Sequence, residues 1–371
     1  MMAGHKMTAA QRIEAAITIT APDRIPICPQ LDYMTARMAG KTCAEYVSSI
    51  GTANECMKIA YKEFGGWDWL YNPTGSYLFI KTFFMDVKVP GLDLPEHTSH
   101  QIVERILSQP EDYDYVIKHG YKAYKKMIME RLGKQIDVAL LPGTMEKIRT
   151  LNQEWESRGI PIQKAGTHFI PFEIFCLHRT FNEFVTDMYR TPEKILEASH
   201  AMLPEILDEI RGTCKLLDNK AFWLGVWRAS ASFISPKQFE KFVHPFIKEI
   251  VMTLIGEGLR PIFHLDGNMA PMLEYFTEYP KGTCIMALDG YTDMRKAKQV
   301  VGDRMCIMGD VPPTLLCLGT EAEVERYCRD LIDDMGPGGG FILGSGCTVP
   351  VNAKVENVKT MIDTGKAYGR Y

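Results

Sequence analysis

The sequence predicts an α/β fold, a closed (β/α)8 TIM barrel that forms one domain over residues 1–371. Short apolar runs alternate with helical stretches along most of the chain, which indicates a parallel sheet because each parallel connection needs a crossover. Eight such runs can be counted, and this number favours a barrel over a doubly wound sheet. Polar residues follow the last four runs at their C-terminal ends, where barrel enzymes place their catalytic groups.

The chain is expected to begin with a helical extension of the barrel, residues 1–23. In the stretch MTAAQRIEAAI, Thr8 stands three residues before Gln11 and forms a capping box that opens a helix. The run DRIPICPQ, residues 23–30, is the first expected strand, and DWLYNP, residues 68–73, is counted as the second. The rest of the N-terminal third is rich in aromatic residues and too irregular to assign.

The remainder of the chain has a regular rhythm. Helices are expected at residues 111–132, 182–216, 236–257, 268–278, 292–301, 320–334 and 353–368. The expected strands beside them are IPIQKAG, AFWLGVW, RPIFHLD, TCIMALD, RMCIMGD and GGFILGSGC. One further run, VALLPG, is assigned to a helix or a loop.

The composition predicts a globular protein with a sizeable core. Hydrophobic residues make up 46% of the chain and charged residues 24%, which excludes intrinsic disorder. A formal net charge of −4, without basic runs interleaved with aromatic residues, argues against a nucleic-acid partner. Neither a signal peptide nor an apolar run of ~18 residues is present, so we expect a cytoplasmic protein without a membrane partner. The ten cysteines include no CxxC pair, and most are expected to be buried thiols.

A histidine and a carboxylate interrupt the apolar run RPIFHLD. Residues two apart in a strand point to the same face, so His264 and Asp266 would present an imidazole and a carboxylate side by side. This arrangement is possible for half of a metal site. The alternative interpretation is a turn over residues 266–268 beside a histidine of the core.

The following strands also end in polar residues. Asp289, Asp310 and Cys347 each stand at the C-terminal end of an expected strand. An aspartate at this place often caps the next helix, and for Asp310 this is the favoured alternative. Neither His264 nor Cys347 has a helix-capping explanation, so the pair favours a functional site.

Five stretches of the sequence carry a resemblance to a known family. They are MTAAQRIEAAITITAPDRIPI, ISPKQFEKFVHPFIKEIV, HLDGNMAPML, VVGDRMCIMGDV and GGGFILGSGCTVPVNAKVENVKTMI. In order and spacing they resemble the uroporphyrinogen decarboxylase superfamily, in particular its branch of corrinoid (cobalamin)-dependent methyltransferases. The resemblance implies a (β/α)8 barrel, in agreement with the strand count. It does not imply decarboxylation, because ICPQLDYMTARMAG lacks the paired arginines with which decarboxylases hold the substrate's propionates.

The methyltransferase branch implies a zinc site and its ligands. Its members are similar in taking ligands from a His-x-Cys, from an acidic residue at the next strand end and from a Cys in a final SGC motif. Carried over to this chain, the resemblance implies His264, Asp289 and Cys347, with Asp266 in the place of the first Cys. His264, Asp266 and Cys347 would also be the catalytic residues. A carboxylate in place of a thiolate makes a harder site, which should prefer an oxygen donor to a sulfur donor.

The activity implied by the resemblance is a zinc-dependent O-demethylation. The methyl group of an O-methyl donor, such as a methoxylated aromatic compound, would pass to the Co(I) of a corrinoid protein, and zinc would polarise the ether oxygen. The chain contains no corrinoid-binding signature of the type Asp-x-His-x-x-Gly, so the corrinoid is expected on a separate partner protein. The alternatives are a methylcorrinoid:thiol methyltransferase, a metal-free decarboxylase of the same fold and a non-catalytic barrel that binds a ligand or a corrinoid protein.

Residues near the expected strand ends could form the substrate wall. Trp227, His168 and Phe169 would suit a methoxylated ring, although most aromatic side chains in a barrel fill its core. Glu173 and Arg228 could contact a substrate carboxylate or take part in proton transfer. A surface ion pair is the alternative for both.

Overall fold

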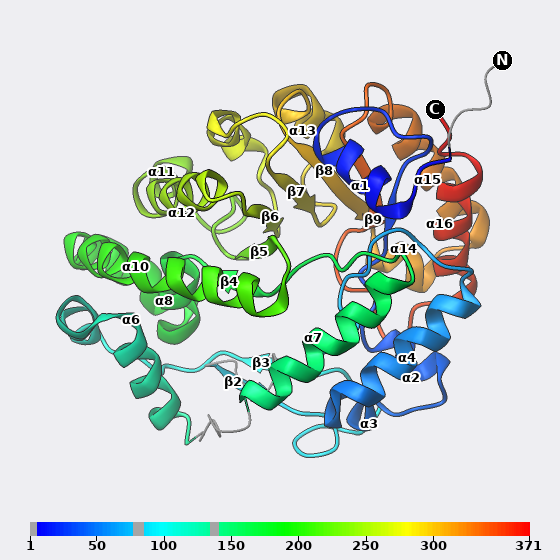
Figure 1. Cartoon of the computed structure of the whole chain (residues 1–371). Coiled ribbons are helices and arrows are strands. Elements are labelled where there is room, and N and C mark those ends of the chain that lie inside the picture. The colour runs from blue at the N-terminus through cyan, green and yellow to red at the C-terminus, as the bar shows by residue number, and fades with distance from the viewer. Residues whose placement is uncertain (1–5, 77–84, 134–140) are drawn as a thin grey trace.

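The computed structural model of the protein describes residues 6–76, 85–133 and 141–371. Seven parallel strands form the central sheet, in the order β1-β9-β8-β7-β6-β5-β4 (Figure 1). These strands are β1 (Ile27–Cys28), β4 (Thr167–Phe169), β5 (Ala221–Val226), β6 (Arg260–Leu265), β7 (Ile285–Leu288), β8 (Cys306–Val311) and β9 (Phe341–Ser345). The first predicted run and the five runs from AFWLGVW onward each contain a strand, and IPIQKAG lies directly before β4.

Residues 68–70 take the place of an eighth strand between β1 and β4. The amides of Asp68 and Trp69 donate to the carbonyl oxygen of Ile27 at 3.0 and 3.2 Å. On the other side, Leu70 forms an isolated parallel bridge with Ile162. The predicted (β/α)8 barrel is therefore confirmed, with DWLYNP in the second position but too sparsely bonded to be a regular strand.

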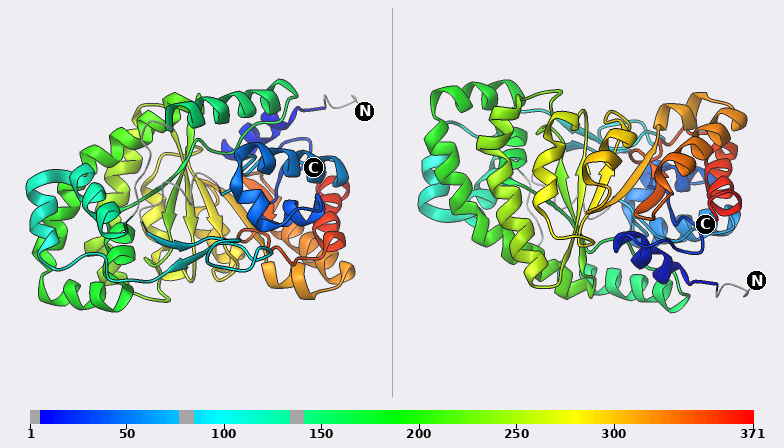
Figure 2. Two further views of the ribbon diagram at one scale, coloured as in Figure 1. Left: turned by 90° about the horizontal axis from the view of Figure 1, so that it is seen from below. Right: turned by 90° about the horizontal axis from the view of Figure 1, so that it is seen from above.

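Helices surround the sheet, and Figure 2 shows the strands between α6, α8 and α10 on one side and α15 and α16 on the other. Before β4 the helices are α1 (Ala9–Ile17), α2 (Met34–Met38), α3 (Cys43–Ser48), α4 (Ile50–Glu63), α6 (Asp112–Arg131) and α7 (Leu141–Ser157). After β4 they are α8 (Pro171–Arg179), α9 (Phe181–Arg190), α10 (Pro192–Leu217), α11 (Pro236–Phe242), α12 (His244–Gly256), the 3-10 helix η1 (Ala270–Glu278), α13 (Met294–Val301), α14 (Pro313–Leu318), α15 (Glu321–Met335) and α16 (Val355–Ala367).

Two predicted helices are each divided in the structure. The stretch 182–216 separates into α9 and α10, and 236–257 separates into α11 and α12. Pro192 and Pro245 lie in the first turn of the later helix in each case. Proline has no amide hydrogen to continue the preceding helix, whereas the first turn of a new helix needs none. Of VALLPG, the part after residue 140 begins α7, and the earlier part lies outside the described residues.

The N-terminal helix α1 covers one end of the barrel. Its predicted capping box is present. The Thr8 hydroxyl accepts from the Gln11 amide, and the Thr8 amide donates to the Gln11 side chain. Ile13 and Ile17 are buried among the interior side chains of the strands. Arg12 fixes the helix by an ion pair with the buried Asp68 at 2.8 Å. The helix of the extension is thus packed against the barrel.

A hairpin that was not predicted lies apart from the main sheet. Its antiparallel strands are β2 (Asp86–Lys88) and β3 (Gln101–Val103), at the lower edge of Figure 1. The ten cysteines are free and mostly buried, as expected. Among the described helices, none is both long and apolar enough to cross a lipid bilayer.

Candidate metal centre

Three potential metal ligands converge at the C-terminal ends of two strands. His264 is the penultimate residue of β6, Asp266 follows that strand, and Cys347 follows β9. One ligand atom from each side chain lies within 4.8 Å of the others. Strands β7 and β8 separate β6 from β9 in the sheet, so closure of the barrel rather than sequence proximity brings these groups together. The predicted group of His264, Asp266 and Cys347 is therefore present.

The side chains of His264 and Asp266 face each other, but no hydrogen bond joins them. His264 Nε2 lies 3.2 Å from Asp266 Oδ1, but the pair lacks the alignment of a hydrogen bond, and Oδ1 has no hydrogen-bond partner among the described residues. The His264 ring stacks on Trp223 with a centroid distance of 4.4 Å and an interplanar angle of 23°. Buried polar atoms are nearly always paired, so an unpaired carboxylate oxygen that faces an imidazole nitrogen fits a cation-binding site.

The surroundings of the three groups disfavour charge on the protein itself. Burial, reinforced by the charges of Asp289 and Glu173, raises the pKa of Asp266 to about 8. Burial likewise raises the pKa of Cys347 to about 11 and lowers the pKa of His264 to about 3. A divalent cation would reverse this preference for the acids, because it stabilises carboxylate and thiolate. Imidazole, carboxylate and thiolate together are a donor set that zinc accepts.

The fourth predicted ligand, Asp289, lies beside this group without belonging to it. Its Oδ2 accepts from the amide of Gly267 at 2.7 Å, and its Oδ1 accepts from the amide of Tyr291 at 3.0 Å. The bond to Gly267 thus holds the loop that follows Asp266, and the bond to Tyr291 holds the loop that follows β7. Asp289 thus supports the ligand loop through Gly267, and its direct ligation, which the resemblance implies, stays a prediction.

Two glycines allow the backbone to bring the ligands together. Gly267 has a φ of +79°, and a Cβ there would lie 2.6 Å from Ser230 Oγ. A Cβ on Gly346 would lie 2.6 Å from the carbonyl oxygen of Asp289. Side chains at these positions would move Asp266 or Cys347 away from the group.

Glu173 is a fully buried carboxyl group next to the three ligands. Its Oε1 accepts from the amides of Arg228 and Ala229 at 2.8 and 3.0 Å, while Oε2 has no partner among the described residues. Burial raises the pKa of Glu173 to about 7, and its charge contributes to the raised pKa of Asp266. The alternative of a surface ion pair is wrong for Glu173, because none of its surface is exposed.

The guanidinium of Arg228 turns away from Glu173 toward the hairpin. Its Nη1 lies 3.0 Å from Glu104 Oε1, in the segment that follows β3, and 3.7 Å from Cys176 Sγ. Glu104 Oε1 also accepts from the amide of Phe181 at 2.7 Å. Arg228 therefore joins the end of β5 to the hairpin segment through an ion pair that is partly exposed.

The aromatic residues of the predicted substrate wall separate into two groups. Phe169 and Trp227 form a T-shaped pair with centroids 4.7 Å apart, pressed against Gly225 of β5. His168 is paired in register with Leu224, whose side chain belongs to the core between sheet and helices. Register partners point to the same face, so His168 points away from the barrel interior. The prediction of His168 as a wall residue is corrected accordingly.

Asp310 does not cap a helix, although capping was the favoured alternative. It is buried at the end of β8, where its Oδ1 accepts from the Tyr327 hydroxyl at 2.9 Å. The N-cap of the next helix, α14, is Pro312. Burial raises the pKa of Asp310 to about 6.

One further residue near the centre was not predicted from the sequence. The Lys164 amine lies over the rings of Tyr71 and Trp223, at 3.5 and 3.7 Å from their centroids. The sequence feature that points to Lys164 is a lysine inside the apolar run IPIQKAG, but a strand at the surface would also explain a lysine there.

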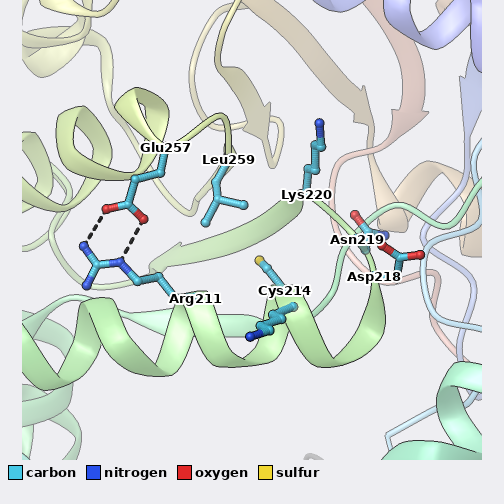
Figure 3. A pocket seen from close by; sticks show the side chains of 8 residues that line it. Arg211, Cys214, Asp218, Asn219, Lys220, Glu257 and Leu259 are labelled. Atoms are coloured by element: carbon cyan, nitrogen blue, oxygen red, sulfur yellow. Dashed lines mark hydrogen bonds and ion pairs between the residues drawn. The ribbon is translucent and has the colours of Figure 1, made fainter.

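A surface hollow lies at the other end of the strands. It has a volume of about 290 Å³ and is lined by side chains from the end of α10, the start of β5 and the segment before β6 (Figure 3). Arg211 and Glu257 cross it in a bidentate ion pair at 2.6 and 2.8 Å. The hollow lies outside the end where barrels carry chemistry, so we do not assign the functional site to it.

Comparisons with known proteins agree with this architecture. The uroporphyrinogen decarboxylase from Syntrophotalea carbinolica is 24% identical over 229 residues, which cover 60% of this chain and 64% of the relative. The enzyme of the same name from Geobacter metallireducens is 27% identical over 232 residues, again 64% of its length, so the match spans less than two thirds of these curated relatives. A solved structure described as a methyltransferase from Methanosarcina mazei superposes with a TM-score of 0.74 at 15% identity and covers 98% of this chain and 99% of its own, which shows the shared fold. The sequence profile described as uroporphyrinogen decarboxylase (URO-D) matches residues 8–368, and the chain therefore belongs to this family.

Proposed function

We propose that the protein is a zinc-dependent methyltransferase that demethylates an O-methyl donor and passes the methyl group to the Co(I) of a separate corrinoid protein. The observation that carries this proposal is the convergence of His264, Asp266 and Cys347, whose ligand atoms lie within 4.8 Å of one another at the C-terminal end of the barrel. When bound there, zinc supplies Lewis acidity that makes an alkoxide or phenoxide a better leaving group.

The chain's own residues prepare the site for this chemistry. The stack on Trp223 fixes the plane of the His264 imidazole, and burial keeps that imidazole neutral and able to ligate. Asp289 holds the loop that carries Asp266 through its bond to Gly267. These contacts orient the donors before a metal arrives, which reduces the cost of assembling the site.

Methyl transfer also needs a proton for the departing oxygen. The methyl carbon–oxygen bond breaks with its electron pair on oxygen, while Co(I) donates an electron pair to the methyl carbon and becomes Co(III). Burial raises the pKa of Glu173 to about 7, and its Oε2 has no partner among the described residues, so we propose that Glu173 gives a proton to the alkoxide near neutral pH. The donor set is harder than a two-thiolate site, which favours an oxygen-linked methyl donor over a thiol acceptor.

A decarboxylase of the same fold is the competing function, because the curated relatives carry that name. The stretch ICPQLDYMTARMAG contains only one arginine, Arg37, and this guanidinium donates to the carbonyl oxygen of Ala353. A substrate with several carboxylates would therefore lack the arginine pair expected to hold it.

Elemental analysis and a spectroscopic assay test the proposal. The purified protein should contain about one zinc per chain, and His264→Ala or Cys347→Ala should lose the metal while keeping the circular dichroism of the wild type. With cob(I)alamin and a methoxylated aromatic compound, the wild type should produce the visible spectrum of methylcobalamin. A matched control is Cys214→Ala on α10, which should retain both zinc and activity.

Two results would contradict the proposal. One is full methyl transfer by Cys347→Ala. The other is a wild-type protein that methylates thiols rapidly and accepts no O-methyl donor, which would return the chain to the thiol methyltransferases.

A further inference from the structure

The segment around β3 reaches across the C-terminal end of the barrel. Before β3, His100 Nδ1 lies 2.7 Å from the hydroxyl of Tyr33, a residue that follows β1. After β3, Glu104 Oε1 lies 3.0 Å from Nη1 of Arg228, a residue that follows β5. In the closed sheet, residues 68–70 and β4 lie between β1 and β5. The short stretch from His100 to Glu104 therefore bridges two strand ends that are not neighbours.

Residues 101–106, here called the strap, are anchored at both ends. At the first end, His100 contacts the hydroxyl of Tyr33, and Tyr33 is buried in the core. At the second end, the amide of Leu107 donates to the carbonyl oxygen of His178 at 2.7 Å. These contacts fix where the strap begins and ends, and they leave its middle to be held by side chains.

Glu104 holds the middle of the strap. Its Oε1 accepts from the amide of Phe181 at 2.7 Å and from Arg228 Nη1 at 3.0 Å. The side chains of Glu104 and Arg228 are 45% and 25% exposed, so solvent weakens their ion pair. Ile102 and Ile106, on either side of Glu104, are exposed as well. The contacts of Glu104 can therefore break without disturbing either anchor.

Arg228 separates the strap from a buried face of α8. Its amide donates to Glu173 Oε1 at 2.8 Å, and its Nη1, the atom that binds Glu104, lies 3.7 Å from Cys176 Sγ. Glu173 and Cys176 are three residues apart in α8 and so share one face of the helix. Both are fully buried, and Glu173 Oε2 has no hydrogen-bond partner in the described part of the chain. A reactant can meet this carboxyl group only when the groups that cover it move.

We propose that the strap is a gate over Glu173 and that Glu104 is its latch. While Glu104 is bonded to Arg228 and to the Phe181 amide, the strap and the guanidinium cover this face of α8. Release of Glu104 lets the strap lift, frees the guanidinium and opens a path to Glu173 from the C-terminal end of the barrel. The inference concerns access alone and does not rest on the proposed zinc or methyl transfer.

Thiol labelling of the full-length protein measures this opening. Cys176 is buried beneath Arg228, so N-ethylmaleimide reacts with it only when this region opens. Mass spectrometry of the peptides gives the labelling rate of each cysteine. Glu104→Ala removes both bonds of the latch and should raise the Cys176 rate about tenfold. Glu104→Gln keeps an acceptor for the Phe181 amide but loses the charge, and it should raise the rate roughly threefold.

Three controls separate the latch from general effects. Cys328, which is buried on α15, should react at the wild-type rate in every variant. Glu96→Gln removes an exposed carboxylate from the connection between β2 and β3, away from Arg228, and should leave the Cys176 rate unchanged. Added salt screens the ion pair, so it should accelerate the labelling of Cys176 in the wild type but not in Glu104→Ala.

Three results would overturn the inference. The first is a Glu104→Ala protein in which Cys176 reacts at the wild-type rate. The second is an equal acceleration of Cys176 and Cys328, which would show that the substitution loosens the whole protein. The third is a Glu96→Gln protein that matches Glu104→Ala, which would assign the effect to the net charge of the hairpin.

Discussion

Acidic side chains around the centre are held in surroundings that oppose their charge. Burial raises the pKa of Asp266 to about 8, of Glu173 to about 7 and of Asp310 to about 6. Each of these carboxyl groups therefore destabilises the folded chain once it ionises. Such residues persist where a site needs them, and a bound cation offsets part of the cost.

Asp310 allows this cost to be measured away from the three ligands. Its folded pKa of about 6 lies above the ordinary value of 3.8, so the stabilisation of its protonated form is complete below pH 3.8 and is lost as the pH rises through 6. Asp310→Asn has no charge to lose and can still accept from the Tyr327 hydroxyl. The variant should be more stable than the wild type at pH 7.5, on the order of 2 to 3 kcal/mol, and this advantage should shrink toward pH 4.5. Urea unfolding of both proteins across that range measures the difference. An advantage that does not vary with pH would show that the burial of charge is not its cause.

Among the elements, β5 shapes the site through one large side chain and one glycine. Trp223 points into the barrel and contacts both His264 and Lys164. Two residues later, Gly225 leaves room for the Phe169 ring and the Trp227 indole. The strand thus positions the aromatic rings through the large side chain of Trp223 and through the space left by Gly225.

A single methyl group at Gly225 should disturb this arrangement. The Cβ of Gly225→Ala would lie 2.7 Å from the Phe169 ring and 3.3 Å from Trp227 Nε1, so the ring pair must move. We expect a loss of stability of about 1 to 3 kcal/mol, as for other overpacked cores, together with a change in tryptophan fluorescence. The matched control is Gly212→Ala on α10, where a Cβ meets nothing within 4 Å and the change should stabilise the helix by roughly 0.5 to 1 kcal/mol. Equal effects of both substitutions in denaturant titrations would contradict the steric explanation.

In the whole molecule, the stabilising ion-pair network and the candidate metal centre lie at opposite ends of the barrel. Arg12 on α1 bonds Asp23 and Asp68, and Asp68 in turn accepts from the amide of Ile27 at the start of β1. This network and the helix that carries it cover the N-terminal ends of the strands. The candidate metal centre occupies the opposite ends, as is usual for barrel enzymes.

Arg12→Met should therefore reduce stability and leave the metal centre intact. The substitution removes the Arg12 charge from a buried network, although Asp68 keeps its ion pair with Arg24 at 2.6 Å. The expected cost is on the order of 3 kcal/mol in urea unfolding at pH 7. Zinc content and the rate of methyl transfer below the unfolding transition should equal those of the wild type. Loss of zinc in a folded Arg12→Met protein would show that the two ends are coupled.

Much of this architecture could be predicted from the sequence, because periodicity and strand ends are local properties. His264, Asp266 and Cys347 follow apolar runs, so their meeting at one end of a barrel follows from the fold class alone. The orientation of a residue within a short strand is different, since a one-residue change of register reverses it. For this reason the sequence predicted both His168 and Phe169 as wall residues, whereas only Phe169 faces the interior. Asp289 illustrates another limit, because only the backbone of the neighbouring loop determines whether its oxygens meet amides or a metal.

The sparse bonding of residues 68–70 makes the barrel unequal around its circumference. Six neighbouring pairs of strands are joined by hydrogen-bonded ladders. Residues 68–70 are instead attached through the amides of Asp68 and Trp69 on one side and through Leu70 on the other. The partners of residues 68–70 come from distant parts of the chain, so ordering this segment closes two large loops. Few hydrogen bonds offset the entropy lost in that closure. The barrel can therefore open along this line while all six ladders stay intact, and such an opening breaks only a few backbone hydrogen bonds. Tyr71 directly follows residues 68–70, so the ring that contacts the Lys164 amine would move with this sparsely bonded segment.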